Sequence, residues 1–291
     1  MNLRETIRQL TNAHLDAGHI VCGQNLSAVG WVGGTLPERT DMVELPNADV
    51  AGSAFAVGMA LAGKRPVFIV RYQGFNWLTA WAVVNYAAKS DALWGRPCPM
   101  LVRSIAMEGR IGPVAGSSHH SLFYRMPGVR VYAPMTPGEW AGMYREFMMP
   151  GASEVFYASE HRGAWGNDTE LLNIQHDKNA QISIYAISIT RFAAMEAQTR
   201  LSREGIRADL LHISQLKPLL VPPPFSAKVL VLDDDYEGGA MSHIALELHR
   251  VFGTETHVLG LPNRTAGFAD WADVLPPTAE QIVKKVKEIL K

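Results

Sequence analysis

The sequence predicts an α/β protein made of two doubly wound domains, and three observations support that prediction. Short apolar runs alternate with helical patterns along the chain, as in parallel sheets covered by helices on both faces. Runs such as residues 67–72 are continuous rather than alternating, which is typical of interior parallel strands. The alternation weakens between residues 163 and 179. We therefore place one domain in residues 1–165, a linker in 166–180 and a second domain in 181–291.

In the first domain, apolar residues recur at helical spacing in four segments, and apolar runs indicate strands between them. The expected helices cover residues 3–17, 49–63, 76–94 and 137–148. The expected strands cover residues 19–24, 67–72, 100–106, 129–134 and 153–159. Three glycines after the first strand, Gly30, Gly33 and Gly34, form either a flexible binding loop or a turn, and we favour the turn.

The second domain repeats the alternation on a smaller scale. Its expected strands are ISIYAIS (182–188), ADLLHIS (208–214), KVLVLDDD (228–235) and THVLGLP (256–262). Helices are expected in residues 191–205 and 240–252, and again at the C-terminal end. That last helix places Ile282, Val286 and Ile289 on one face, so we expect it to pack on a core.

Composition excludes several classes of function. The chain has 291 residues, 47% of them hydrophobic, and a formal net charge of −1. A nucleic-acid-binding protein usually has a basic surplus, which is absent here. No run is long and apolar enough for a membrane span, and the N-terminus lacks the apolar core of a signal peptide. With two cysteines and no CxxC motif, a reducing cytoplasm is the expected location.

The stretch from Leu45 to Gly63 is the most distinctive in the chain. Asp49 lies in the first turn of the expected helix, where the unpaired N–H groups and the helix dipole favour a carboxylate. No charged residue occurs from Val50 to Gly63, and most residues there are small. We therefore expect this helix to be buried on most sides, against another helix or subunit.

The order of these motifs resembles a known domain. An acidic residue, the small-residue helix with AVGMALAGKRPVF (56–68), then YQGF (72–75) and VVNYAAK (83–89) resemble the pyrimidine-binding domain of thiamine-diphosphate enzymes. The likeness is to beta subunits of 2-oxo-acid dehydrogenases and to the C-terminal half of transketolases. The second domain, with HISQLKPL (212–219) and LPPTAEQIVKKVKEIL (275–290), is similar to the transketolase C-terminal domain.

The resemblance implies thiamine diphosphate and Mg²⁺ as cofactors, together with a partner subunit. In these families the diphosphate and Mg²⁺ are held on another domain by a Gly-Asp-Gly segment, which this sequence lacks. An alpha-like subunit would therefore supply that site in an α2β2 heterotetramer, and this chain would have no metal ligands of its own. We interpret DDDYEGG (233–239) as a structural turn.

The resemblance also assigns candidate residues to the cofactor site. Asp49 stands where the families have a glutamate that activates the cofactor by accepting a proton from the pyrimidine ring. Aspartate is one methylene shorter, so a moved backbone, a bridging water or impaired activation would follow. A helix-capping role is the alternative, and Glu44 is the candidate if the register differs. Tyr72 and Phe75 match the pocket aromatics, and Leu78 occupies a third position.

A segment rich in glycine and serine, residues 107–121, contains two adjacent histidines. Histidine can transfer protons near neutral pH and hydrogen-bond a substrate carbonyl. The beta subunits have His-Ser at this point, so His120 is the first catalytic candidate and His119 the second, with exposed loop histidines as the alternative. Further candidates for an anionic substrate are Arg103, Arg110, His161 and Arg162, each of which could instead be a surface residue.

The sequence therefore predicts one subunit of a two-component thiamine-diphosphate enzyme that acts on small carbonyl compounds. Because the histidine segment is short and Asp49 replaces glutamate, we favour a split transketolase-like carboligase that transfers a ketol or acyl unit. A beta subunit of a 2-oxo-acid dehydrogenase is the first alternative. A non-catalytic structural subunit is the second.

Overall fold

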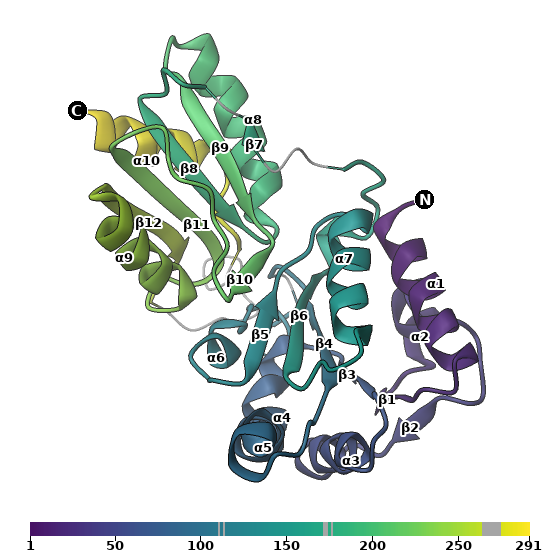
Figure 1. The fold of residues 1–291 in the computed structure, drawn as a ribbon. Helices are drawn as coiled ribbons and strands as arrows, with labels where there is room; N and C mark the ends of the chain where they lie inside the picture. The colour runs from purple at the N-terminus through teal and green to yellow at the C-terminus, as the bar shows by residue number, and fades with distance from the viewer. Residues whose placement is uncertain (110, 113, 171–173, 176, 264–274) are drawn as a thin grey trace.

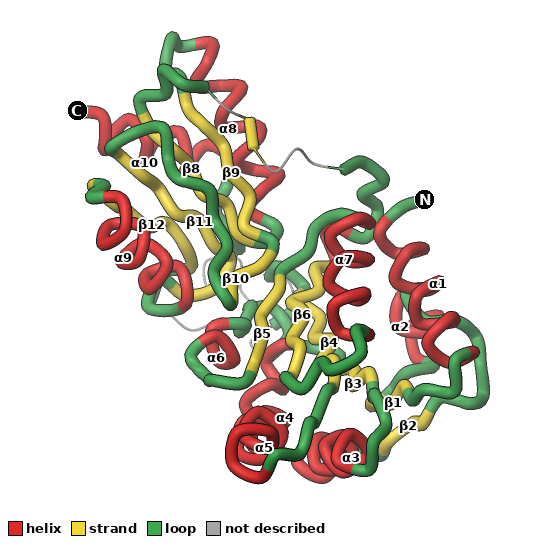
Figure 2. Tube along the Cα trace, in the orientation of Figure 1, coloured by secondary structure: helices red, strands yellow, loops and turns green. Residues whose placement is uncertain are grey.

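The computed structural model describes residues 1–109, 111–112, 114–170, 174–175, 177–263 and 275–291. The chain forms two sheets, each flanked by helices, with the N-terminus on the first unit and the C-terminus on the second (Figure 1). The same arrangement, coloured by secondary structure, separates the helical layers from the strands (Figure 2). The predicted fold class of two doubly wound α/β units is confirmed.

Among the described residues, the first sheet has seven strands in the order β10-β5-β6-β4-β3-β1-β2. They are β1 (Val21–Gln24), β2 (Val43–Leu45), β3 (Val67–Val70), β4 (Met100–Ala106), β5 (Val129–Tyr132), β6 (Val155–His161) and β10 (Gln215–Lys217). β10 runs antiparallel to β5, while the other neighbours are parallel. A strand from the second half of the chain thus completes the edge of the first sheet.

Helices cover both faces of this sheet. On one face lie α1 (Leu3–Asp16) and α7 (Pro137–Met148), which pack against each other. On the other lie α3 (Asp49–Leu61), α4 (Asn76–Ala82), a π-helical turn (Val83–Ala87), α5 (Ala88–Trp94) and the short α6 (Ser121–Tyr124). The helix predicted over residues 76–94 is therefore present, with the π-helical turn in its middle.

The second sheet has the order β12-β11-β8-β9-β7 within the described residues. Its strands are β7 (Ile174–Gln175), β8 (Ile182–Ile187), β9 (Ala208–Ile213), β11 (Lys228–Tyr236) and β12 (Glu255–Leu261). α8 (Thr190–Arg203) and α10 (Ala279–Leu290) cover one face, and α9 (Ala240–Phe252) covers the other. β7 lies within the stretch predicted as a linker.

The two units share one apolar core. The cluster under α3 and α4 continues through Leu216 of β10 to Ile187, Val231 and Ile244 of the second unit. At this junction the end of β6 meets the end of β11, where Nδ1 of His161 lies 3.4 Å from a carboxylate oxygen of Asp234. Polar side chains at that junction are consequently buried as well.

One segment differs from the sequence-based expectation. Residues Ala28–Gly34 form a short helical segment, α2, whose backbone from Val29 to Gly33 has positive φ. Glycine adopts that conformation without strain, but Val29, Trp31 and Val32 do so at a steric cost. Among the described residues, no helix has the length and hydropathy needed to cross a membrane.

Candidate functional site

A cavity of about 370 Å³ opens at the carboxyl ends of three neighbouring parallel strands, β2, β1 and β3. Its lining includes Asn25 after β1, Asn47 and Asp49 after β2, and Tyr72 and Phe75 after β3. Ligands of open α/β sheets bind at this edge, where the loops that leave the strands converge. The structure thus brings together three residues that the sequence assigned to one cofactor pocket.

Asp49 is the first residue of α3, and it lines this cavity. The N-cap residue is Ala48, and no side chain caps the helix. Within the described part of the chain, the Asp49 carboxylate makes no hydrogen bond or ion pair. The capping alternative therefore has no support, and the carboxylate is available to a ligand at the positive end of the helix dipole.

The aromatic wall of the cavity follows from a tight turn after β3. The rings of Tyr72 and Phe75 lie 6.0 Å apart at 37°; Tyr72 precedes the 3-10 turn Gln73–Phe75, and Phe75 is its last residue. A Cβ on Gly74 would lie 2.0 Å from the carbonyl oxygen of Val114, so only glycine fits there.

Two other candidates lie outside the cavity as far as its described lining goes. Leu78 is 48% exposed on the outer side of α4. The Glu44 carboxylate accepts a hydrogen bond from the backbone N–H of Ser27 at 3.4 Å. Neither residue therefore contacts the space that Asp49 lines.

His120, the first catalytic candidate, is completely buried at the junction of the two units. Its Nε2 atom lies 2.8 Å from Oδ2 of Asp233, at the end of β11. Burial alone would lower the pKa of His120, but Asp233, helped by Asp235 and Asp234, raises it to about 10. Burial raises the pKa of Asp233 to about 6, against the opposing effect of His120. Between these values the two form an imidazolium–carboxylate pair.

His119, the second candidate, faces a different space. A groove of about 1020 Å³ runs between the units, and Trp77, His119 and Tyr236 form part of its wall. The His119 ring lies 5.9 Å from the Trp77 ring and 6.3 Å from the Tyr236 ring. The backbone N–H of His119 donates to Oε1 of Gln73 at 2.7 Å, which ties this segment to the turn that bears Phe75.

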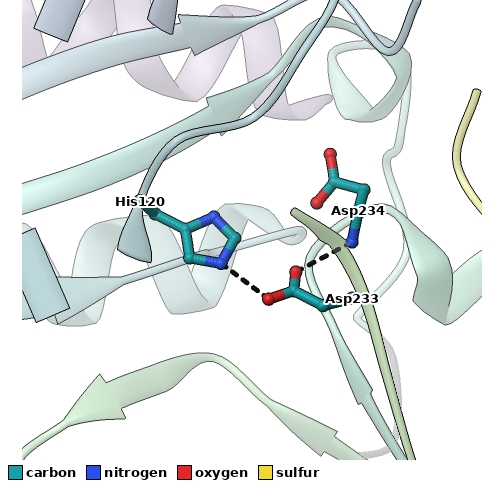
Figure 3. A group of neighbouring side chains, drawn as sticks. All are labelled: His120, Asp233 and Asp234. Atoms are coloured by element: carbon teal, nitrogen blue, oxygen red, sulfur yellow. Dashed lines mark hydrogen bonds and ion pairs between the residues drawn. The ribbon is translucent and has the colours of Figure 1, made fainter. Parts of the chain in front are cut away.

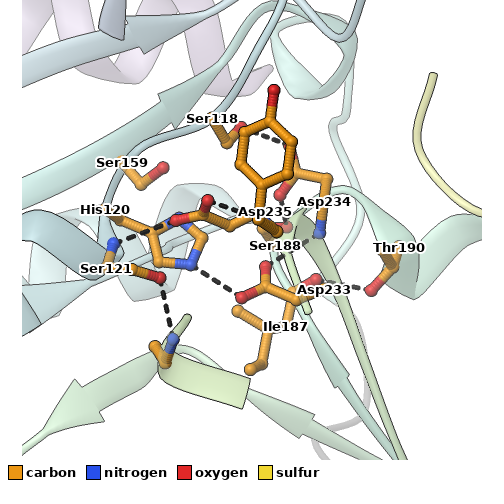
Figure 4. Close-up of polar contacts among 12 residues, drawn as sticks. Ser118, His120, Ser121, Ser159, Ile187, Ser188, Thr190, Asp233, Asp234 and Asp235 are labelled. Atoms are coloured by element: carbon orange, nitrogen blue, oxygen red, sulfur yellow. Dashed lines mark hydrogen bonds and ion pairs between the residues drawn. The ribbon is translucent and has the colours of Figure 1, made fainter. Parts of the chain in front are cut away.

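Three consecutive aspartates at the end of β11 hold the histidine segment, and the sequence did not reveal this role. Asp233 pairs with His120, Asp234 accepts hydrogen bonds from the Ser118 and Ser188 hydroxyls, and Asp235 accepts one from the backbone N–H of Ser121 (Figure 4). We interpreted this stretch as a structural turn, yet all three carboxylates are buried. The sequence signal that could have indicated this role is the run of three acidic residues at the end of an apolar strand, KVLVLDDD.

A series of buried polar contacts links Gln73, in the turn beside the cavity, to Asp234 at the junction of the two units. Gln73 donates from Nε2 to Ser159 Oγ at 2.7 Å, and Ser159 Oγ lies 2.9 Å from Nε2 of His161. Nδ1 of His161 lies 3.4 Å from a carboxylate oxygen of both Glu108 and Asp234. Burial opposes the charged form of His161, but Asp234 and Glu108 raise its pKa.

His120, Asp233 and Asp234 have the residue types of a metal site, with candidate ligand atoms within 4.8 Å of one another. Figure 3 shows His120 and Asp233 pointing toward each other, while the Asp234 carboxylate points away from Asp233. Asp233 Oδ1 also accepts the backbone N–H of Asp234 at 2.8 Å. All four carboxylate oxygens of Asp233 and Asp234 and Nε2 of His120 already have partners, whereas Nδ1 of His120 has none among the described residues. We therefore interpret the group as an ion pair.

The arginines suggested for an anionic substrate are not gathered at one site. Arg103 is 1% exposed and forms an ion pair with Glu160, so the expectation that it meets substrate is wrong. Arg162 is exposed after β6. Arg110 lies outside the described residues.

Comparison with known proteins places these features in a family context. Residues 39–164 match the family model of the transketolase pyrimidine-binding domain. The beta subunit of an acetoin:2,6-dichlorophenolindophenol oxidoreductase from Cupriavidus necator is 26% identical over 197 residues, or 61% of this chain and 56% of that protein. The beta subunit of 2-oxoisovalerate dehydrogenase from Bacillus subtilis is 26% identical over 230 residues, or 70% of this chain and 68% of that protein.

Two solved structures have the same fold. A split-gene transketolase in an inactive beta4 tetramer has a TM-score of 0.75 at 17% identity, covering 99% of this chain and 97% of that one. Transketolase from Campylobacter jejuni has a TM-score of 0.73 at 12% identity, covering 98% of this chain and 46% of that one. The match to the acetoin relative thus spans little more than half of that protein, whereas the split transketolase chain is matched over nearly its whole length.

Proposed function

We propose that this chain, which contains a transketolase pyrimidine-binding domain and resembles the beta subunits of thiamine-diphosphate enzymes, is the pyrimidine-binding subunit of a two-component enzyme of that class. The observation that supports this most directly is that Asp49, whose carboxylate is unpaired among the described residues, lines a cavity whose wall contains Tyr72 and Phe75. Its small-molecule substrates would be carbonyl compounds, and its location the cytoplasm.

The residues around the cavity fit the aminopyrimidine end of thiamine diphosphate. A flat heteroaromatic ring needs an apolar slot, and Phe68, Tyr72 and Phe75 supply apolar and aromatic surface there. Ring nitrogens and an amino group need polar partners, which Asn25, Asn47 and Asp49 offer. When bound, this cofactor supplies the carbon nucleophile for cleaving and forming bonds next to a carbonyl. Asp49 would hold a proton shared with a ring nitrogen of the pyrimidine.

The diphosphate and Mg²⁺ would be held by an alpha-like partner subunit in an α2β2 assembly. This sequence has no Gly-Asp-Gly segment, and the structurally similar split transketolase is an inactive beta4 tetramer. Both facts support a chain that needs a partner for activity. The cavity would then be one half of a site closed by the second subunit.

The exposed face of α3 supports a packed subunit contact beside this cavity. Gly52, Ser53, Ala56, Val57 and Ala60 are buried, so one face of the helix packs on its own sheet. The opposite face has no charge and leaves Val50 49% and Phe55 38% exposed. Nε1 of Trp81 donates to the Val50 carbonyl oxygen at 3.0 Å, continuing the apolar surface onto α4. Because the helix that begins at Asp49 bears this face, we assign it to the alpha-like partner.

Replacing Gly58 by leucine tests that contact. A Cβ at Gly58 meets no atom within 4 Å, and glycine costs roughly 0.5–1 kcal/mol relative to alanine in a helix. The isolated Gly58→Leu chain should therefore fold with unchanged or slightly higher stability. Its affinity for the partner should fall at least about tenfold, because the new side chain prevents close approach.

Binding to the alpha-like subunit is measured by calorimetry, and self-association by sedimentation. The control is Gly142→Leu, which makes the same substitution at a glycine inside another helix, α7. A glycine with positive φ, such as Gly253, would not serve, because a side chain there strains the backbone. Full affinity of Gly58→Leu for the partner contradicts this placement. If Gly58→Leu loses self-association but keeps its affinity for the partner, this face of α3 is instead a contact between copies of this chain.

We favour a split transketolase-like carboligase, with a 2-oxo-acid dehydrogenase component as the second candidate. The near-complete length match to the split transketolase chain supports the first. The names of two sequence relatives, the beta subunits of 2-oxoisovalerate dehydrogenase and of the pyruvate dehydrogenase E1 component, support the second. Incubating the assembled pair with a ketose phosphate plus an aldehyde, and separately with a 2-oxo acid plus a lipoyl domain, distinguishes them. A folded complex that binds no thiamine diphosphate would favour a structural subunit.

A further inference from the structure

In the histidine segment, Ser118, His120 and Ser121 are hydrogen-bonded to the second unit, whereas the His119 ring makes no hydrogen bond with a described residue. Ser118, His120 and Ser121 are each bound by one of the three consecutive aspartates of β11. The Ser121 hydroxyl also accepts the backbone N–H of Ala240 at 2.8 Å, fixing the segment to the start of α9. Of these four consecutive residues, His119 and Ser121 line the groove. The Ser121 hydroxyl already bonds Ala240, so the His119 ring is the groove-lining side chain that remains available to a ligand.

We propose, on the basis of the function proposed above, that His119 rather than His120 contacts the substrate, and that Asp233, Asp234 and Asp235 are positioning residues that aim it into the groove between the units. His120 would then serve as the buried anchor of the segment. The second unit would contribute to the reaction through this clamp (Figure 4).

The groove adjoins the cofactor cavity across a single turn. Trp77, which touches His119 edge-on, follows Phe75 of the cavity wall by two residues. Gln73, between Tyr72 and Phe75, accepts the hydrogen bond from the His119 backbone. A small carbonyl compound in the groove therefore lies next to the turn that would hold the pyrimidine ring.

The His119 ring is suited to contact a ligand. It meets the Trp77 ring edge-on and the Tyr236 ring at a tilt, and its nitrogens make no hydrogen bond with any described residue. The ring of His120, by contrast, is fully buried: its Nε2 donates to Asp233, and its Nδ1 has no hydrogen-bond partner among the described residues and no exposure to the groove. A neutral imidazole at position 119 can donate one hydrogen bond to a substrate oxygen and accept another.

Electrostatics separate the two neighbouring histidines. Burial lowers the pKa of His119, the positive charge of His120 acts in the same direction, and Asp235 and Asp234 oppose both. Asp233 instead keeps His120 charged. In active sites, two neighbouring titratable groups whose pKa values are moved apart usually have different roles in proton transfer. The other titratable side chains along the groove are Tyr124, Arg125, Lys217, Asp235, Tyr236, His243 and Glu247.

The first test uses the assembled enzyme with its partner. His119→Ala should lower kcat by about 10²-fold or more, while the melting temperature and thiamine-diphosphate affinity stay within error. Wild-type activity should decline as pH falls through the lowered pKa of His119, below 6.5, and His119→Gln should lose that acidic limb. His120→Gln should retain the limb and instead lower the melting temperature. Full activity of His119→Ala, or loss of the limb only in His120→Gln, overturns the assignment.

The second test needs no turnover, so it separates this inference from the function it rests on. Nitrogen-15 NMR of the histidine rings in the isolated chain should show His119 titrating below pH 6.5 and His120 protonated well above pH 8. Asp233→Asn should abolish the high titration and free the segment to hydrogen exchange, while His257→Gln on β12 should change neither. A His120 ring that stays neutral at pH 7, or unchanged exchange in Asp233→Asn, refutes the clamp even if the enzyme binds its cofactor.

Discussion

Replacement of Asp49 by asparagine should lower kcat of the assembled enzyme by about 10²–10⁴-fold, the range attributed to a positioned proton-transfer group. The amide keeps the size of the carboxylate but cannot share a proton with a ring nitrogen of the pyrimidine. Because Asp49 makes no hydrogen bond within the described chain, the substitution should leave the free energy of unfolding nearly unchanged. Steady-state kinetics and thermal denaturation on the same preparation measure both quantities.

Two control variants sharpen this prediction. Asp49→Glu restores the methylene found in the resembled families and should retain activity well above Asp49→Asn. Glu44→Gln lies nearby in the sequence, but its side chain bonds the Ser27 backbone rather than lining the cavity, so it should retain kcat. Equal activity of Asp49→Asn and the wild type would remove the catalytic role of this carboxylate.

Replacement of Glu160 by alanine should destabilise the isolated chain by about 3–5 kcal/mol, the usual cost of leaving one member of a buried ion pair alone. Glu160 is fully buried and accepts hydrogen bonds from Arg103 and, at 2.7 Å, from Nε1 of Trp165. Its removal leaves the Arg103 guanidinium charged and without its carboxylate in the core. Urea denaturation should show a lower midpoint with an unchanged slope.

An exposed pair provides the matched control for Glu160. Glu196 and Arg200 form an i,i+4 pair on α8, with side chains 57% and 47% exposed. Glu196→Ala should change the free energy of unfolding by less than about 1 kcal/mol, since water screens such pairs. The double replacement Arg103→Met with Glu160→Leu should recover much of the loss. A cost below 1 kcal/mol for Glu160→Ala alone would contradict the buried pair.

Local patterns predicted the regular elements well. The helix predicted over residues 137–148 is confirmed as α7, and the structure adds Thr136 as its N-cap. The limits of α9 likewise agree with the pattern, with Gly253 ending the helix at positive φ. Hydrophobic periodicity and end signals are short-range properties that a sequence displays directly. The strands β2, β7 and β10 were not predicted, because each is two or three residues long and depends on a distant partner.

In the candidate site, too, some residues were predicted from the sequence, whereas contacts between residues far apart in the chain were not. Asp49, Tyr72 and Phe75 were expected to meet because the family resemblance assigns them to one pocket. They line one cavity, Asp49 after β2 and the two aromatics after β3. The pairing of His120 with Asp233 joins residues 113 positions apart, which no local pattern encodes. Arg103 and Glu160, 57 positions apart, were hidden for the same reason. In both cases the position of the side chain depends on a buried ion pair with a residue far away in the sequence.

The central claim is that this chain provides half of a shared cofactor site. Isothermal titration of thiamine diphosphate and Mg²⁺ into this chain alone, and then into the chain co-purified with a partner that has a Gly-Asp-Gly segment, tests it most directly. We expect no measurable binding to the chain alone and saturable binding, one cofactor per chain pair, to the complex. Tight binding to the isolated chain, or none to a verified complex, would contradict the account.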